Sequence, residues 1–231
     1  FFETYYHPGN ASLTLAGAIE PDRAFELARR YFKEIPNGPT PPPVTWPDVP
    51  AAHAERRLQL EDQVELPRLY LAWPAPALFA PGDAELDVLG EILASGKSSR
   101  LYRQLVHDRR IAVDVGASQA SREHSGVFSV VATAAPGHSL SELEAVVADE
   151  LSRMAADGPS DDEVERARTT VEADFVYRLQ TVGGFGGKAD QLNAYNVFKG
   201  NPDYCDADLT RYTTLDAERI RAAAAIAGCQ G

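Results

Sequence analysis

Gly96-Lys97-Ser98 has the residue types that close a phosphate-binding loop, in which backbone N–H groups and a lysine hold the phosphates of a nucleotide. That loop also requires an earlier glycine, and Glu91 occupies its position. Before Gly96, the apolar residues have the spacing of a helix rather than a strand, and Asp83 is suited to cap that helix: the stripe is Leu86, Leu89, Ile92 and Leu93. The sequence therefore argues against a nucleotide site.

A second glycine-rich stretch, residues 183–190, also places a lysine after a glycine. Val182 stands where a phosphate-binding loop has its first glycine, and Ala189 stands where it has serine or threonine. The glycines of this stretch are Gly183, Gly184, Gly186 and Gly187. Because glycine has no Cβ atom to restrict the backbone, the stretch predicts either a plain turn between two helices or a flexible joint that moves with a ligand or partner.

The residues that could bind a metal or act as nucleophiles do not have the necessary spacing. No two of the five histidines lie three or four residues apart, so the helical motif that binds zinc through two histidines is missing. The sequence has no G-x-S-x-G, and neither Cys205 nor Cys229 has a histidine nearby. Residue chemistry alone therefore predicts no catalytic residue and no metal site in this chain.

Composition excludes some classes of partner. The 231 residues are 44% hydrophobic, which allows a sizeable core, and they carry a net charge of −12. Nucleic acids and anionic membranes require a basic surface, so neither is an expected partner. No apolar run reaches the roughly 18 residues of a membrane span. The two cysteines form no recognisable motif, which leaves the cytoplasm, the periplasm and the cell envelope all open.

The order of predicted elements favours an α+β fold. Alternating apolar residues predict strands at 11–19, 55–62, 66–74, 111–119 and 126–134. Helical spacing predicts helices at 21–35, 83–94, 99–108, 139–158 and 160–180, with two more after the second glycine-rich stretch. Ser160 and Glu163 have the spacing of a capping box. Strand pairs followed by helix pairs predict a mostly antiparallel sheet with helices packed on one face.

The proline-rich stretch 39–57 is expected to be a linker between two domains, because dense prolines stiffen the chain and cannot complete a sheet ladder. The chain starts on an aromatic cluster without a methionine and stops inside or just after a helix. We therefore expect a fragment of a longer protein.

Several stretches resemble the M16 (insulinase/pitrilysin-type) zinc metallopeptidases. The quoted segments are "FFETYYHPGNASLTLAGAIEPDRAFELARRYFKEIPNG", "GKSSRLYRQLV", "KADQLNAYNVFKGNPDY" and "DLTRYTTLDAERI", which occur in the family's order. The resemblance implies that residues 1–38 are the C-terminal tail of the zinc-binding domain and that 58–231 are a second, truncated domain of the same type. It also implies that the helix–turn–helix corner is a structural hallmark, in which Gly96 makes the turn and Ser98 caps a helix: Gly96, Ser98, Ser99, Arg100, Leu101 and Tyr102.

The resemblance implies a peptidase whose zinc is bound upstream of Phe1, by an H-x-x-E-H motif and a later glutamate. The chain itself is then expected to be a non-catalytic portion that helps to wall a chamber around a peptide substrate. The alternative is an inactive M16-fold scaffold or assembly subunit that acts by binding only.

One departure from the family pattern concerns "LVHDRRIAV", where the family's non-zinc half commonly has an arginine and a tyrosine that hold the substrate. Val106 and Val113 stand at those positions, and valine can neither donate a hydrogen bond nor carry charge. Either the chain comes from the zinc-bearing half, whose homologous partner half supplies arginine and tyrosine, or it comes from a member without peptidase activity. That partner half could be fused or separate, and a homodimer is also open.

Overall fold

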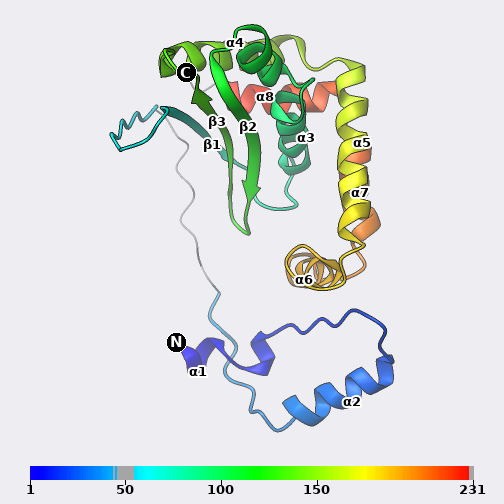
Figure 1. The fold of residues 1–231 in the computed structure, drawn as a ribbon. Helices are drawn as coiled ribbons and strands as arrows, with labels where there is room; N and C mark the ends of the chain where they lie inside the picture. The colour runs from blue at the N-terminus through cyan, green and yellow to red at the C-terminus, as the bar shows by residue number, and fades with distance from the viewer. Residues whose placement is uncertain (44, 46–54, 229–231) are drawn as a thin grey trace. The chain divides into compact units, whose positions relative to one another are not determined.

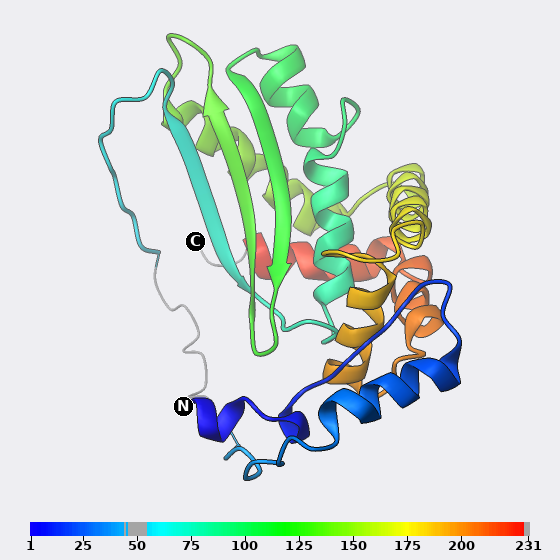
Figure 2. The ribbon, with the colours of Figure 1, turned by 60° about the horizontal axis from the view of Figure 1, so that its bottom comes forward.

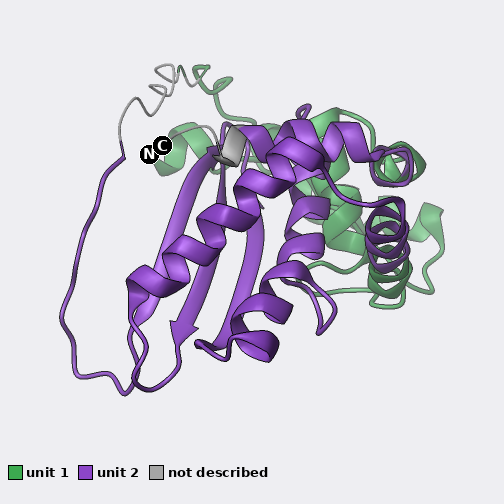
Figure 3. Ribbon diagram, turned by 90° about the horizontal axis from the view of Figure 1, so that it is seen from above, with its two compact units in different colours: residues 1–47, 173–209 green, residues 48–172, 210–231 purple. Residues whose placement is uncertain are grey.

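The computed structural model describes residues 1–43, 45 and 55–228 (Figure 1). The chain divides into two compact units, which are distinguished by colour in Figure 3. Unit 1 contains residues 1–47 and 173–209, and unit 2 contains residues 48–172 and 210–231. The predicted linker at 39–57 lies partly outside the described residues, since 44 and 46–54 are not among them.

Unit 2 is built on an antiparallel sheet of three strands. These are β1 (Arg68–Ala75), β2 (Ala112–Ser121) and β3 (Gly126–Ala134), and their order in the sheet is β1-β3-β2. Tyr70 of β1 pairs with Val131 of β3, and Ser118 of β2 pairs with Ser129 of β3. The central strand β3 alternates in its first half: Phe128 and Val130 are fully buried, whereas Val127 is 47% exposed.

Helices cover one face of this sheet, and within the described residues of unit 2 no helix packs on the other face, which is called the open face below (Figure 2). They are α3 (Asp83–Ala94), α4 (Leu140–Asp157), α8 (Ala217–Gly228) and the π-helix η2 (Tyr102–Asp108). One apolar cluster joins the elements of the unit, and its fully buried members include Leu89, Leu101, Leu105, Phe128, Leu143, Met154 and Ile220. The predicted α+β fold with helices on one face is therefore confirmed.

Gly90 explains how α3 reaches the sheet. A Cβ atom at this position would lie 3.1 Å from the backbone oxygen of Ala117 in β2. Glycine in a helix interior costs about 1 kcal/mol relative to alanine. Here the missing side chain lets the helix lie directly against the strand.

Unit 1 contains α1 (Phe2–Tyr5), the 3₁₀-helix η1 (Pro8–Asn10), α2 (Pro21–Phe32) and α6 (Lys188–Lys199). The helices α5 (Asp161–Arg178) and α7 (Cys205–Thr213) each have one end in unit 1 and the other in unit 2. Inside unit 1, the hydroxyl of Tyr195 donates a hydrogen bond of 2.8 Å to Asp208. Burial beside this carboxylate raises the pKa of Tyr195 far above its usual range.

Two predicted strands are wrong. Residues 11–19 and 55–62 are irregular in the structure, although their apolar residues alternate. In the second segment Leu58 and Leu60 are 83% and 80% exposed, and within the described chain neither segment has a partner strand. A strand needs a neighbouring strand for its backbone hydrogen bonds, and β1 pairs with β3 rather than with residues 55–62.

The two predicted helix caps have different outcomes. The capping box at the start of α5 is present, since Ser160 N–H donates to Glu163 and Glu163 N–H donates to the Ser160 hydroxyl. The expected cap at Asp83 is wrong: Asp83 is the first residue of α3, and its carboxylate accepts from Phe79 N–H and from Arg211. No helix in the described part of the chain is long and apolar enough to cross a membrane.

Candidate functional site

The corner between α3 and η2 turns at Gly96, whose φ of +72° is strained for any residue with a side chain. The hydroxyl of Ser99, which is buried, donates a hydrogen bond of 2.7 Å to the Gly96 carbonyl. Helical backbone begins at Arg100, so the position before the helix belongs to Ser99. The predicted cap at Ser98 is therefore wrong by one residue, and Ser98 is exposed.

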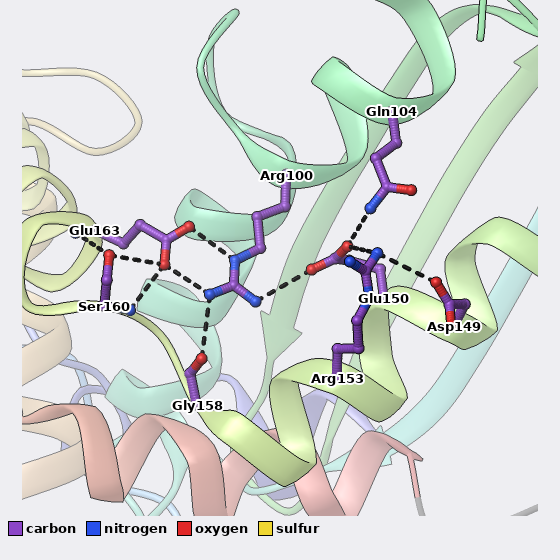
Figure 4. Close-up of polar contacts among 8 residues, drawn as sticks. All are labelled: Arg100, Gln104, Asp149, Glu150, Arg153, Gly158, Ser160 and Glu163. Atoms are coloured by element: carbon purple, nitrogen blue, oxygen red, sulfur yellow. Dashed lines mark hydrogen bonds and ion pairs between the residues drawn. The ribbon is translucent and has the colours of Figure 1, made fainter. Parts of the chain in front are cut away.

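Arg100 joins the corner to two helices and a loop, as Figure 4 shows. Its Nε and Nη2 atoms each donate to the carboxylate of Glu163 at 2.7 Å. Its Nη1 atom donates to Glu150 at 3.1 Å, and Nη2 also donates to the Gly158 carbonyl at 3.1 Å. One guanidinium group thus holds η2, α4 and the start of α5 together.

Glu150 is a buried carboxylate on the apolar face of α4, with only 2% of its surface exposed. Its partners besides Arg100 are Gln104, whose amide donates to it, and Arg153, whose Nη2 lies 2.6 Å away. Arg153 also lies 3.2 Å from Asp149. Each charge inside this network has an opposite charge as a direct neighbour, which is the condition under which buried charges are tolerated.

The network lowers the pKa of Glu163 from 4.5 to about 2. The hydrogen bonds from Arg100 are the largest cause, and the backbone N–H of Ser160 adds to them against the opposing effect of burial. The pKa of Arg100 is raised, again mainly by Glu163. Glu163 and Arg100 therefore stay charged at neutral pH, and neither is poised as a general acid or base for proton transfer.

The remaining corner residues support packing. Leu101 is fully buried in the core, and Tyr102 is half-buried. The geometry therefore fits a structural hallmark that fixes the corner, and the role of its six residues stays a prediction.

A family comparison settles where this architecture belongs. Residues 1–171 match the family described as the peptidase M16 inactive domain. The chain belongs to the peptidase M16 family. The resemblance identified in the sequence is therefore confirmed.

Two curated M16 relatives are zinc proteases by name. Zinc protease PqqE of Helicobacter pylori is 24% identical over 206 residues, which cover 88% of the chain and 46% of that protein. An uncharacterized zinc protease of Streptomyces coelicolor is 25% identical over 231 residues, covering 97% of the chain and 49% of that protein. The chain thus spans about half the length of the curated relatives it matches.

Solved structures show the M16 fold. A crystal structure of a protease from Helicobacter pylori superimposes with a TM-score of 0.84 at 22% identity, and the match covers 96% of the chain and 53% of that protein. The peptidase M16 inactive domain from Pseudomonas fluorescens gives 0.67 at 20% identity, with coverage of 90% and 48%. At this level of identity the agreement concerns the fold.

Zinc does not fit the side chains that the structure describes in this M16 chain. Among the residues that the structure describes, no group of three or more histidine, cysteine, aspartate or glutamate side chains could hold a metal ion. His107, His124 and His138 lie beside the carboxylates of Asp108, Glu123 and Glu142, respectively. A protein zinc site needs three or four converging ligands, so the location of zinc ligands upstream of Phe1 stays a prediction.

Val106 and Val113 stand where the resemblance places the family's substrate-holding arginine and tyrosine. Val106 lies on η2 and packs against the core, and Val113 lies at the start of β2 with 45% of its surface exposed. The pairing of β2 with β3 is irregular between Ala112 and Asp114. Neither valine can donate a hydrogen bond or carry charge, so these two side chains cannot stabilise a developing negative charge.

The glycines of the second stretch form a turn between α5 and α6. Gly184 and Gly186 have φ of +80° and +76°, and a Cβ atom on Gly187 would lie 2.7 Å from the Gly183 oxygen. Lys188 N–H donates to the Thr181 carbonyl at 2.8 Å, which closes the turn. The flexible joint at these glycines stays a prediction.

Sequence reasoning missed Glu150, which is the most buried partner of Arg100. A signal was present, since Glu150 lies among the apolar positions of α4 with Val147, Leu151 and Met154. A carboxylate on the apolar face of a helix indicates a buried cation nearby. Its partner could not be identified, because Arg100 is 50 residues away in the sequence.

Proposed function

We propose that the chain is a non-catalytic portion of a zinc-dependent endopeptidase and forms part of the wall of the chamber that encloses a peptide substrate. The observation that carries the proposal is the open face of the sheet in unit 2. Helices pack on one face, while Tyr70 and Val127 on the other are 67% and 47% exposed. A chamber wall needs one face that packs against the rest of the protein and one face that is exposed to the peptide.

Membership of the family's inactive domain supports a role outside the chemistry. In the proposal, the zinc ligands and the catalytic glutamate lie upstream of Phe1, and a homologous half, fused or separate, supplies the arginine and tyrosine that Val106 and Val113 cannot replace. Residues 1–38 are then the tail of the zinc-binding domain, 39–57 the linker and 58–231 the second domain.

Photo-crosslinking in the full-length parent protein tests the open face. A photoreactive phenylalanine analogue is placed at Val127 on the open face, or at Ser152, which is exposed on α4. A chelator prevents cleavage, and an unfolded peptide is added before irradiation. We expect crosslinked peptide from Val127 and little from Ser152; equal yields at the two positions would contradict the proposal.

Metal analysis separates the peptidase from a scaffold of the same fold. We expect the full-length parent to bind zinc and to cleave an unfolded peptide, and residues 1–231 alone to do neither. A parent without zinc or cleavage would assign the protein to the inactive scaffolds. Stoichiometric zinc or specific cleavage in residues 1–231 alone would overturn the proposal that this portion is non-catalytic.

A further inference from the structure

The side chains on the open face of unit 2 lie in rows that cross the three strands. Residues that pair directly between antiparallel strands point to the same face of a sheet, and every second residue of a strand returns to that face. The register therefore gives four rows on the open face, each with one residue from β1, one from β3 and one from β2. The first row is Arg68, Thr133 and Asp114.

The charges on this face are confined to the first row. Of the twelve residues in the four rows, Arg68 and Asp114 are the two that are charged, and their signs are opposite. Arg68 Nε donates a hydrogen bond of 3.0 Å to the hydroxyl of Thr133, which donates one of 3.0 Å to the carboxylate of Asp114. The two charges are thus linked at one end of the face and sum to zero, although the whole chain carries −12.

The other three rows form a low and uncharged surface. Tyr70, Val127 and Val131 are its larger side chains, and the first two are 67% and 47% exposed. The remaining six residues are small: Ala72, Pro74, Gly116, Ser118, Ala120 and Ser129. A Cβ atom on Gly116 would meet no described atom within 4 Å. A peptide in an extended conformation can therefore bring its backbone close to the sheet.

This surface favours one class of peptide segment. A charged side chain held against the three uncharged rows would lose water without gaining a partner of opposite charge, which is unfavourable. Small and aliphatic side chains lose no such hydration, and they gain from the burial of apolar surface. A charged residue that flanks the segment can meet an opposite charge at Arg68 or Asp114, where the uncharged surface ends.

We propose that the open face accepts an uncharged segment of the peptide substrate, rich in small and aliphatic residues. The inference rests on the proposed function, in which this face is exposed to the peptide, and it adds the substrate class that the face favours. It is carried by the register of the strands, which places nine uncharged residues side by side in a chain whose residues are 24% charged.

Three peptides of equal length test the inference in the full-length parent, with the photoreactive analogue at Val127 and a chelator to prevent cleavage. One peptide is built from serine, alanine and valine. The others carry glutamate or lysine at every third position, so that both sides of an extended segment are charged. We expect the uncharged peptide to give about threefold more crosslinked product than either charged peptide. The use of both signs separates this effect from the net negative charge, which would disfavour glutamate and favour lysine.

Substitution of Ser129 tests whether the effect is local, because Ser129 lies on the same face two residues from Val127. Ser129→Asp should raise the yield from the lysine peptide about threefold and lower that from the glutamate peptide, and Ser129→Lys should do the reverse. The matched controls are Ser152→Asp and Ser152→Lys on the exposed side of α4, which should change each yield by less than about twofold. The comparison of the three peptides with Ser129 in place decides the inference if a variant does not fold.

The outcomes distinguish the inference from the proposed function. Equal yields from the three peptides, or a preference for a charged peptide, would overturn the inference and leave the proposed function standing. Crosslinks between two copies of the parent in place of peptide would assign the open face to a dimer interface and overturn both. A failure of Val127 to crosslink any of the peptides would refute the proposed function and the inference with it.

Discussion

At the scale of single residues, Glu163 is the side chain on which most of the corner depends. It holds Arg100 through two hydrogen bonds of 2.7 Å and also closes the capping box with Ser160. We expect Glu163→Gln to lower the free energy of unfolding by about 2 kcal/mol, because Arg100 loses its main partner while partly buried. Urea denaturation followed by circular dichroism measures this change.

The matched control for this substitution is Glu165→Gln. Glu165 is exposed on the same helix, and the change removes the same charge. Its effect should stay within about 0.5 kcal/mol. If the two substitutions cost the same, the Arg100 network does not stabilise the fold.

The same carboxyl gives a prediction about pH. Folding lowers the pKa of Glu163 from 4.5 to about 2. A group whose pKa is lowered by folding contributes stability that is complete above its unfolded pKa and is lost as the pH falls through its folded pKa. The difference in unfolding free energy between the unaltered chain and Glu163→Gln should therefore be constant near neutral pH and shrink between about pH 4.5 and 2.

Urea titrations of both proteins at stepped pH values measure this difference, in which the titration of other groups largely cancels. A difference that disappears already above pH 5, or that does not decrease by pH 3, would contradict the assignment of the shift to Glu163.

At the scale of elements, Gly90 predicts how tightly α3 is fixed to the sheet. We expect Gly90→Val to destabilise unit 2 by about 2 kcal/mol, because even a Cβ atom would lie 3.1 Å from the Ala117 oxygen. Gly116→Val is the control, since a Cβ atom there would meet nothing within 4 Å and valine favours strands. Thermal unfolding of both variants gives the comparison; equal stability would mean that the helix moves freely relative to β2.

Local pattern predicted the elements whose partners are close in sequence. The helix predicted at 139–158, the capping box of α5 and the strands predicted at 111–119 and 126–134 all appear in the structure. The strands predicted at 11–19 and 55–62 are wrong. Alternating apolar residues indicate that an extended segment could bury one side, but they do not show that a partner strand is available. Helical spacing also could not distinguish the π-helix η2 from an α-helix, since their periods are close.

The candidate site was only partly predictable. The resemblance indicated Arg100 as a corner residue, but its carboxylate partners follow it by 50 and 63 residues, and spacing carries no information over such distances. The sequence shows which charged residues are present, and only the fold shows which of them are in contact.

At the scale of the whole molecule, the two units differ in how much apolar surface they bury. The helix α4 buries Leu143, Val147, Leu151 and Met154. In contrast, α2 has no buried residue, and its Phe25 and Phe32 are 65% and 47% exposed. Together with residues 13–20, α2 lines an apolar hollow of about 530 Å³. If residues 1–38 are the tail of a larger domain, the rest of that domain should cover this surface.

Hydrogen exchange measured by mass spectrometry tests that assignment. In residues 1–231 alone, we expect the amides of α2 to exchange nearly as fast as an unfolded chain, because a helix without tertiary packing opens readily. In the full-length parent they should slow by about 100-fold or more as the apolar face becomes covered. The amides of α4 serve as the internal control, since its core is complete in both proteins and their protection should not change. Equal protection of α2 in the two proteins would show that its apolar face is not a domain interface.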